Sequence, residues 1–294
     1  ELAGFAALVN DGNNFSDKKI TLDDDIVLND VLDADDWANT GPDNLWTAIG
    51  TSDNPFAGTF DGDGHTVSGV YISIAANYQG LFGYIDSGGV VENVGVTDSY
   101  IEGVSNIGGV IGYSNGTVSN CYNTGGVTGS GSNVGGLVGY SNGGTVSNSC
   151  NTGGVSGGGS NVGGVAGNNN GGTVSNSCNT GGIYGGGSNV GGVAGENNST
   201  IVNCAALNQL VSGSNDVHRV AGFNGGDLSA NYAFSGMTGG GSDRTQDGLD
   251  GGDISVVQIF DGSFWLDTLG WDDSIWIIKD DGLPILKNMV GEKT

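Results

Sequence analysis

Two histidines and several groups of aspartates are the residues whose types and spacing could support acid–base chemistry. His65 ends the segment Asp61-Gly62-Asp63-Gly64-His65, in which a carboxylate beside an imidazole could act as an acid and base pair. The two Asp-Gly pairs are also strong turn signals, and no nucleophile accompanies them. We therefore interpret this segment as a turn, assign no catalytic residue, and interpret His218, next to Arg219, as a surface substitution rather than a ligand.

The aspartates could alternatively bind calcium, because carboxylate oxygens are the ligands that this hard cation prefers. The sequence contains neither an EF-hand loop nor the Gly-Gly-x-Gly-x-Asp calcium repeat. A solvated acidic surface is our main interpretation, a structural calcium ion is the alternative, and no other cofactor is expected. The candidate calcium ligands are Asp23, Asp24, Asp25, Asp61, Asp63, Asp243, Asp247, Asp250 and Asp253.

Four cysteines lie in the chain without the C-x-x-C spacing that is typical of zinc or redox sites. Cys150 and Cys178 occupy equivalent positions of a repeat, so a disulfide between adjacent repeats is geometrically feasible. We favour buried free thiols instead, because cysteine is also a small hydrophobe that fits a narrow core. Cys121 and Cys204 align one position earlier, so their side chains should face the opposite way.

The charge of the chain excludes several partners. The 294 residues carry a formal net charge of −25, which disfavours nucleic acid and an anionic membrane surface. No apolar run approaches the length that spans a bilayer, so we expect no membrane insertion of this segment. Between Val104 and Ala206 the one charged side chain is Glu196, so nearly all carboxylates lie in the two flanks.

Near-identical repeats of about 28 residues fill the middle of the chain. Three copies begin at Ser132-Asn133-Val134, Ser160-Asn161-Val162 and Ser188-Asn189-Val190, and degenerate copies extend the array from about Gly80 to Phe234. Each copy contains short β-prone pieces between clusters of Gly, Ser and Asn, with no helical period. Such pieces cannot bury an apolar face alone, so the repeats must stack.

These features predict an all-β fold, a parallel β-helix with about 28 residues per coil and a cap at each end. The usual crossover is right-handed. Equivalent residues would lie about 4.8 Å apart in adjacent coils, a spacing that penalises repeated charges but allows amides to form ladders. The predicted inward columns are Val134, Val162 and Val190, and Val146 with Val174; the predicted ladders are Asn133, Asn161 and Asn189, and Asn148 with Asn176.

The flanks are predicted to be the caps, because a solenoid must cover its open edges. A short helix with Leu2, Phe5, Ala6 and Val9 on one face would precede a strand through Ile20, Leu22, Ile26 and Leu28. The aromatic residues near the other end, including Phe264, Trp265, Trp271 and Trp276, would form the second cap. The predicted divisions are 1–79 for the first cap and coils, 80–235 for the repeats, 236–253 for a linker or long loop, and 254–294 for the second cap.

Rows of equivalent threonines, Thr145 with Thr173 and Thr152 with Thr180, are interpreted as ordinary strand chemistry rather than as an ice-binding face. The run Gly157-Gly158-Gly159 is interpreted as a corner rather than a phosphate-binding loop, because neither a lysine nor a helix start follows it.

The motif Gly80-Leu81-Phe82-Gly83 and its copy Gly136-Leu137-Val138-Gly139 resemble the tetrapeptide that names the GLUG repeat family. The segment from Phe56 to Gly69 also resembles the one that precedes such repeats in bacterial surface proteins. The resemblance covers about Phe5 to Leu286. It implies a β-helical fold in an exported bacterial protein, in a family that includes adhesins and the non-protease regions of immunoglobulin A peptidases, and it supplies no catalytic motif.

We therefore predict a non-catalytic, cell-surface or secreted scaffold that adheres to a protein or glycan of a host or neighbouring cell. The chain opens without a basic and apolar leader, so for an exported protein we expect the signal peptide to have been removed. One alternative is a polysaccharide lyase or hydrolase, which would need converging carboxylates or basic groups from the acidic flanks. The other is a passive spacer that projects another domain.

Overall fold

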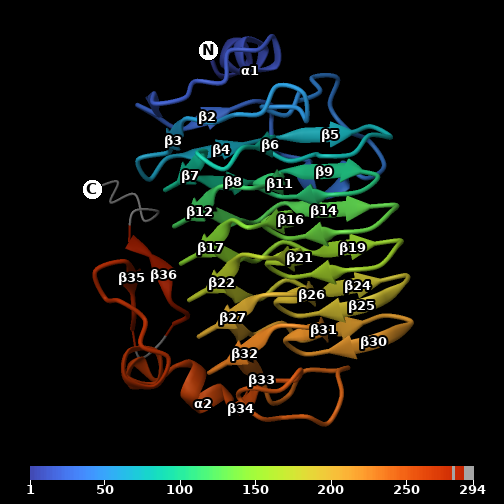
Figure 1. The fold of residues 1–294 in the computed structure, drawn as a ribbon, viewed down its shortest axis with the longest axis vertical. Helices are drawn as coiled ribbons and strands as arrows, with labels where there is room; N and C mark the ends of the chain where they lie inside the picture. The colour runs from blue at the N-terminus through green and yellow to red at the C-terminus, as the bar shows by residue number, and fades with distance from the viewer. Residues whose placement is uncertain (280–281, 288–294) are drawn as a thin grey trace.

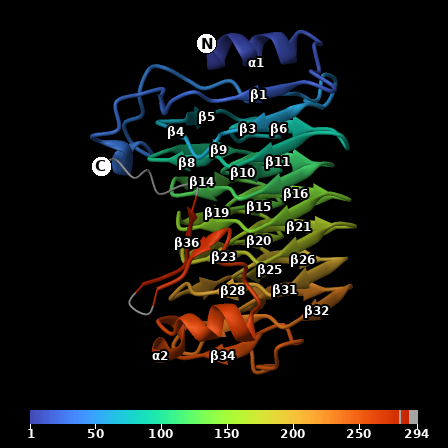
Figure 2. The same ribbon diagram turned by 90° about the vertical axis from the view of Figure 1, so that its left-hand side faces the viewer.

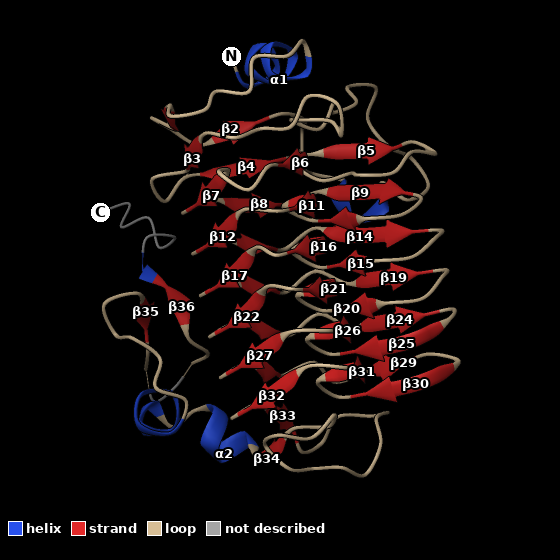
Figure 3. Cartoon of the chain, in the orientation of Figure 1, coloured by secondary structure: helices blue, strands red, loops and turns tan. Residues whose placement is uncertain are grey.

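The computed structural model describes residues 1–279 and 282–287 and forms a column of parallel β-strand coils with little helix (Figures 1 and 3). The predicted all-β parallel β-helix with about 28 residues per coil is therefore confirmed. Equivalent asparagines of adjacent coils lie 28 or 27 residues apart in the sequence. Of the predicted second cap, residues 280–281 and 288–294 lie outside the described residues.

Each central coil contributes five short strands, one to each of five parallel sheets that we call walls 1 to 5 in chain order. Wall 1 has eight strands, namely β1 (Lys19–Thr21), β3 (Thr59–Asp61), β7 (Val90–Glu92), β12 (Thr117–Ser119), β17 (Thr145–Ser147), β22 (Thr173–Ser175), β27 (Thr200–Val202) and β32 (Asp227–Ser229). Wall 2 has nine, namely β2 (Ile26–Val27), β4 (Thr66–Ser68), β8 (Gly95–Thr97), β13 (Tyr122–Asn123), β18 (Cys150–Asn151), β23 (Cys178–Asn179), β28 (Ala205–Ala206), β33 (Tyr232–Phe234) and β34 (Gly252–Ile254).

The other three walls are shorter. Wall 3 contains β5 (Tyr71–Ser73), β9 (Tyr100–Gly103), β14 (Gly126–Gly129), β19 (Val155–Gly157), β24 (Ile183–Gly185) and β29 (Val211–Ser212). Wall 4 contains β10 (Ile107–Gly108), β15 (Val134–Gly135), β20 (Val162–Gly163), β25 (Ser188–Gly191) and β30 (Asn215–His218). Wall 5 contains β6 (Phe82–Ile85), β11 (Ile111–Ser114), β16 (Val138–Asn142), β21 (Ala166–Asn170), β26 (Ala194–Asn197) and β31 (Ala221–Asn224).

Apolar side chains stack inside the walls in the predicted columns. Val134 pairs with Val162, which pairs with Val190, and all three are fully buried. Val146 and Val174 form a second such column on wall 1. Because every coil presents the same small branched residues, the core is narrow and its packing repeats from coil to coil.

Asparagine has two structural roles in the coils. The predicted ladder of Asn133, Asn161 and Asn189 is confirmed, since each Nδ2 donates to the Oδ1 of the asparagine one coil before it, at 2.9 Å for both steps. Asn148 and Asn176 share the left-handed backbone of this ladder, but the ladder predicted for them is wrong: no side-chain hydrogen bond joins them, and the buried Oδ1 of Asn176 has no partner among the described residues.

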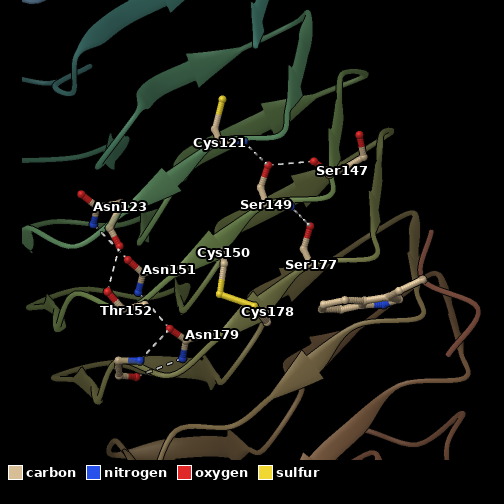
Figure 4. Close-up of a disulfide and its surroundings, with 12 residues drawn as sticks. Cys121, Asn123, Ser147, Ser149, Cys150, Asn151, Thr152, Ser177, Cys178 and Asn179 are labelled. Carbon is tan, nitrogen blue, oxygen red and sulfur yellow. Dashed lines mark hydrogen bonds between the residues drawn. A yellow bond between two sulfur atoms is a disulfide. The ribbon is translucent and has the colours of Figure 1, made fainter. Parts of the chain in front are cut away.

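A second amide ladder, which the sequence reasoning missed, runs through the core side of wall 2. Asn123 donates to Asn151, and Asn151 donates to Asn179, at 2.9 and 2.8 Å, with all three side chains fully buried (Figure 4). The shared amides satisfy one another, so these polar groups can stack inside the coils without a charge.

Glycine is required where neighbouring coils approach closely. A Cβ on Gly164 would collide with the carbonyl oxygen of Gly192 in the next coil, and one on Gly136 would collide with that of Gly164. Gly136, Gly164 and Gly192 occupy equivalent positions in successive coils, and we call them the glycine column. In the next coil this position is occupied by Arg219, whose carbonyl oxygen lies against Gly192. A side chain is tolerated at this position in the last full coil, and that of Arg219 is fully buried.

The first cap agrees with the prediction in its helix and differs in its strand. Helix α1 (Leu2–Asn10) lies over the end of the column and buries Leu2, Ala6 and Val9 (Figure 1). The single strand predicted through Ile20 to Leu28 is wrong, because two short strands, β1 and β2, flank a turn at residues 23–25. The turn moves the chain from wall 1 to wall 2, and a 3-10 helix, η1 (Ala34–Asp36), follows.

The C-terminal segment folds back along the outside of wall 2. It comprises α2 (Val256–Ile259), a π-helical turn η2 (Phe264–Thr268) and the antiparallel hairpin β35 (Trp276–Ile277) and β36 (Ile285–Leu286). Its apolar residues form a second core with Cys178, Leu207 and Tyr232 of the coils, and Figure 2 shows β36 in front of β23. Within the described residues, no helix is long and apolar enough to cross a membrane.

Candidate functional site

The turn at His65 gathers the one group of potential metal ligands found among the described residues. Oxygen and nitrogen atoms of Asp24, Asp25 and His65 lie within 4.8 Å of one another, with both carboxylates exposed. His65 Nδ1 lies 3.4 Å from Asp25 Oδ1, which also accepts the backbone N–H of Thr66. The hydrogen bond from this N–H is the main reason why the pKa of Asp25 is lowered. The main partner of the carboxylate is therefore the backbone of the turn rather than His65.

The neighbouring candidates Asp61 and Asp63 are held by protein groups. Asp61 accepts hydrogen bonds from Asn93 and from the backbone of Asp63, and Lys19 lies 2.6 Å from its other oxygen. Asp63 has a left-handed backbone with φ 49°, as expected for the predicted turn. The two carboxylates therefore do not form a ligand set with His65.

The four C-terminal candidates also point toward protein donors rather than toward one another. Asp250 is fully buried and accepts the backbone N–H groups of Arg219, Gly241 and Asp243. Asp253 accepts from the Arg219 guanidinium at 2.7 Å. The remaining two carboxylates bind locally, Asp243 to Thr245 and Asp247 to the backbone of Ala230. Calcium binding stays the untested alternative, and the protein donors at these four positions account for the carboxylates without it.

His218 belongs to this network, which corrects its interpretation as a surface substitution. Its side chain is 23% exposed, and Nδ1 lies 3.2 Å from Asp250 Oδ2. That hydrogen bond raises the pKa of His218. Burial alone would raise the pKa of Asp250, but the bonds from His218 and from the backbone of Arg219 and Gly241 outweigh it and lower the pKa to about 2.

Cys150 and Cys178 form a disulfide between adjacent coils, so the prediction of free thiols at these two positions is wrong (Figure 4). Both side chains stand on the outer face of wall 2, in register on adjacent strands, and pack against the second core that the C-terminal segment forms. Cys121 and Cys204 face the opposite way, as predicted; they point into the core as free thiols, and burial raises the pKa of each to about 12. The one-residue offset thus separates the two kinds of cysteine.

The surroundings of the disulfide suit a structural link better than thiol exchange. Cys178 is 3% exposed, and a thiolate released there would be buried without a neighbouring cation. Such a thiolate is a poor leaving group, so attack by an outside thiol on Cys150 is disfavoured.

An apolar cavity of about 340 Å³ lies between the C-terminal hairpin and wall 2, and we call it the cap cleft. The disulfide is part of its lining. Among the described residues, the lining comprises Tyr122, Cys150, Thr152, Cys178, Thr180, Leu207, Trp276, Leu283, Pro284, Ile285 and Leu286, none of which carries a charge. Sequence reasoning missed the cleft, because it depends on where the C-terminal segment packs.

A shallower polar groove of about 430 Å³ runs along the outside of wall 3, and we call it the wall 3 groove. Glu102, Thr128, Ser156 and Tyr184 follow one another in register on adjacent strands and line it, with Tyr184 50% exposed. Tyr184 stands where the otherwise near-identical preceding repeat has Ser156, a departure in the sequence that could have marked this groove.

The tyrosines of wall 5 are arranged differently. Tyr84 stacks on Tyr113 at 4.4 Å between ring centroids, and Tyr113 stacks on Tyr140 at 5.0 Å. Burial within this stack raises the pKa of Tyr113 to about 12. Because the rings cover one another's faces, this stack stabilises adjacent coils and leaves less ring surface for a ligand than the single ring of Tyr184 does.

The fold and these surfaces define a parallel β-helix with polar walls and one apolar outer face that its own C-terminal segment covers. No family model matches the chain, so membership of the GLUG family stays a prediction. Among solved structures, the chain is similar to one described as a "putative immunoglobulin A1 protease" from Bacteroides ovatus, with a TM-score of 0.68 and 21% identity over 98% of this chain and 90% of that one. At this identity the likeness shows the fold alone.

Two curated proteins match part of the chain. One is halomucin from Haloquadratum walsbyi, 46% identical over 79 residues. The other is a "Putative Gly-rich membrane protein" from Evansella cellulosilytica, 37% identical over 79 residues. Each match spans 26% of this chain but 1% of halomucin and 9% of the second protein. The chain thus corresponds to a small part of each relative.

Proposed function

We propose that this chain is an exported, non-catalytic binding module that adheres to an uncharged glycan or to a protein on a host or neighbouring cell. The observation that carries the proposal is the wall 3 groove, in which one carboxylate and one exposed aromatic ring flank a floor of hydroxyl groups. Sugars offer apolar ring faces and many hydroxyls, so this combination suits them.

The dimensions of the groove suit a chain-like ligand. Tyr184 lies three strands beyond Glu102, which corresponds to about 14 Å at the spacing of strands in a sheet. Between them Thr128 and Ser156 repeat their hydroxyls once per coil. A ligand along the groove would meet an aliphatic hydroxyl on each of these two adjacent coils, which favours a polymer of similar units.

The charges in the groove support a non-catalytic role. Glycoside hydrolysis commonly uses two carboxylates that flank the scissile bond. Glu102 is the single carboxylate among the residues that line the groove, and it already accepts the Ser73 hydroxyl at 2.7 Å. The groove therefore offers binding groups without an acid and base pair.

Two observations support export. The disulfide between Cys150 and Cys178 is of a kind that persists in oxidising compartments outside the cytosol. One curated relative is named as a membrane protein, which agrees with a location at the cell envelope.

Binding to a glycan array and to extracellular-matrix proteins tests this function. Tyr184→Ala should weaken binding by about tenfold or more, because the exposed ring is lost, while Phe223→Ala should change little. Phe223 is a matched control, since it is 47% exposed and lies on wall 5. The absence of any bound glycan or protein would contradict adhesion and favour a spacer. Cleavage of a polysaccharide by the purified chain would overturn the non-catalytic part.

A further inference from the structure

The cap cleft is a cavity whose described lining is mainly apolar. Wall 2 presents an outward column of Tyr122, Cys150 and Cys178, in register on adjacent strands. The C-terminal hairpin faces this column with Trp276, Leu286 and their neighbours. The two surfaces share one apolar core, and the cavity of about 340 Å³ lies between their described residues.

The size of the cavity is that of a ligand site rather than a packing defect. Pockets for small molecules begin at about 300 Å³, and a dry cavity of about 150 Å³ already binds benzene. Such sites also form preferentially between separate structural units. The cap cleft meets both conditions, because a coil wall forms one side and the C-terminal hairpin forms the other.

The lining indicates the chemistry of the ligand. No charged side chain of the part of the chain that the structure describes lines the cleft, so an ion would lose its hydration without compensation from these residues. Thr152 and Thr180 add hydroxyl groups to the wall 2 side. The ligand should therefore be uncharged and mainly apolar, with a polar atom that these hydroxyls can bind.

Trp276 supplies a further polar group at the cleft. The indole Nε1 atoms of Trp265 and Trp271 donate to the carbonyls of Ile259 and Asn203, each at 2.9 Å. The Nε1 of Trp276 is buried and has no partner among the described residues, although this side chain lines the cavity. Buried indole N–H groups usually find an acceptor, so a small rearrangement on binding would let it donate to the ligand.

We propose that the cap cleft binds a small, uncharged, mainly apolar molecule that carries one hydrogen-bond acceptor, against the Cys150–Cys178 disulfide and Trp276. This site is separate from the wall 3 groove, because the two have no lining residue in common. The proposal therefore stands independently of glycan or protein adhesion.

Fluorescence titration of the full chain with prodan, 6-propionyl-2-(dimethylamino)naphthalene, tests the proposal. Prodan is uncharged, carries one carbonyl acceptor and absorbs where tryptophan emits. We expect saturable binding at one site, with energy transfer from the nearby tryptophans to the probe. The anionic probe 1-anilinonaphthalene-8-sulfonate, of comparable size, should bind at least about tenfold more weakly, because none of the described lining residues is a cation that could receive its sulfonate.

Thr180→Trp places a large side chain in the cleft and should weaken prodan binding by at least about tenfold. Thr173→Trp is the matched control, a half-buried threonine of the same coil on wall 1, and should bind as the unmodified chain does. Thr152→Trp, at an exposed position of the same cleft, replaces Thr180→Trp if circular dichroism shows that the latter fails to fold. Equal prodan affinity in a folded cleft variant and the Thr173→Trp control, or no saturable binding by the unmodified chain, would overturn the proposal.

Discussion

Between Val104 and Ala206 the coils contain one charged side chain, Glu196, whereas the next coil buries Arg219 against the buried Asp250 of the segment that follows it. The central coils have identical neighbours on both sides, so a charge in one copy would face the same charge in the next. The last full coil lacks such a neighbour beyond it and can use charged groups to satisfy its edge. The position of a coil in the stack therefore decides whether it can contain buried charged side chains.

The glycine column makes this difference concrete. Gly136, Gly164 and Gly192 have no room for a side chain, because the carbonyl of the next coil lies where a Cβ would be. Arg219 occupies the same column and donates to the carbonyls of Phe234 and Gly251 and to Asp253. The guanidinium of Arg219 thus donates hydrogen bonds to backbone carbonyls that, in the central coils, would pair with the backbone of a further repeat.

The largest expected effect comes from placing a charge in the central stack. Asn151→Asp should destabilise the fold by roughly 4 kcal/mol, because a fully buried carboxylate would replace an amide that donates to Asn179 and to Gly153. Urea unfolding measures the change. Thr152→Asp adds the same charge at the adjacent exposed position and should cost less than about 1 kcal/mol. If Asn151→Asp also cost less than about 1 kcal/mol, the stack would tolerate a buried charge.

The reciprocal change removes the charge from the last coil. Arg219→Met keeps most of the apolar stem but leaves its carbonyl acceptors unpaired, at an expected cost of roughly 3 to 4 kcal/mol. Arg244→Met is the control, since Arg244 is 42% exposed and lies 3.5 Å from the same Asp253 oxygen; its loss should cost under about 0.5 kcal/mol. If Arg219→Met unfolds at the same urea concentration as Arg244→Met, the buried arginine does not stabilise the edge.

The stacking of the central coils could largely be predicted from the sequence. The packing of the last full coil and of the C-terminal segment could not. Val134, Val162 and Val190 line up because near-identical repeats dictate their own register. The offset of Cys121 from Cys150 was also readable, but which of the two faced outward depended on the twist of each corner. The cap cleft and the contacts of Arg219 involve segments that occur once in the sequence. Because these segments have no repeated copy, the sequence pattern does not show where they pack.

Removing the disulfide tests whether the stacking of like residues is enough to stabilise the central coils. Replacing Cys150 and Cys178 by alanine should cost about 3 kcal/mol, because a link across 28 residues restricts the unfolded chain. A reducing agent should lower the stability of the unmodified chain by a similar amount and should leave the double variant unchanged. If the reducing agent destabilises both equally, its effect does not come from this disulfide.

The smallest effect is the pH dependence of the last coil. The pKa of Asp250 falls from its ordinary value of 3.8 to about 2 in the folded chain. Its contribution, about 2 kcal/mol, is therefore present above pH 3.8 and is lost as the pH falls toward 2. The pKa of His218 is raised from 6.5, so its contribution is present below pH 6.5 and is lost as the pH rises through the raised value.

The His218–Asp250 pair should thus stabilise the last coil most between about pH 4 and 6.5, while the uncharged central coils contribute little pH dependence. Asp61 and Asp25 also have lowered pKa values, so acid would weaken the first cap as well. Hydrogen exchange resolved by residue separates the two ends. In acid, amides of residues 215–234 should lose protection in the unmodified chain, and Asp250→Asn should remove this pH dependence without altering that of residues 19–27. An unchanged acid response at residues 215–234 in Asp250→Asn would show that the buried pair does not control the stability of this end.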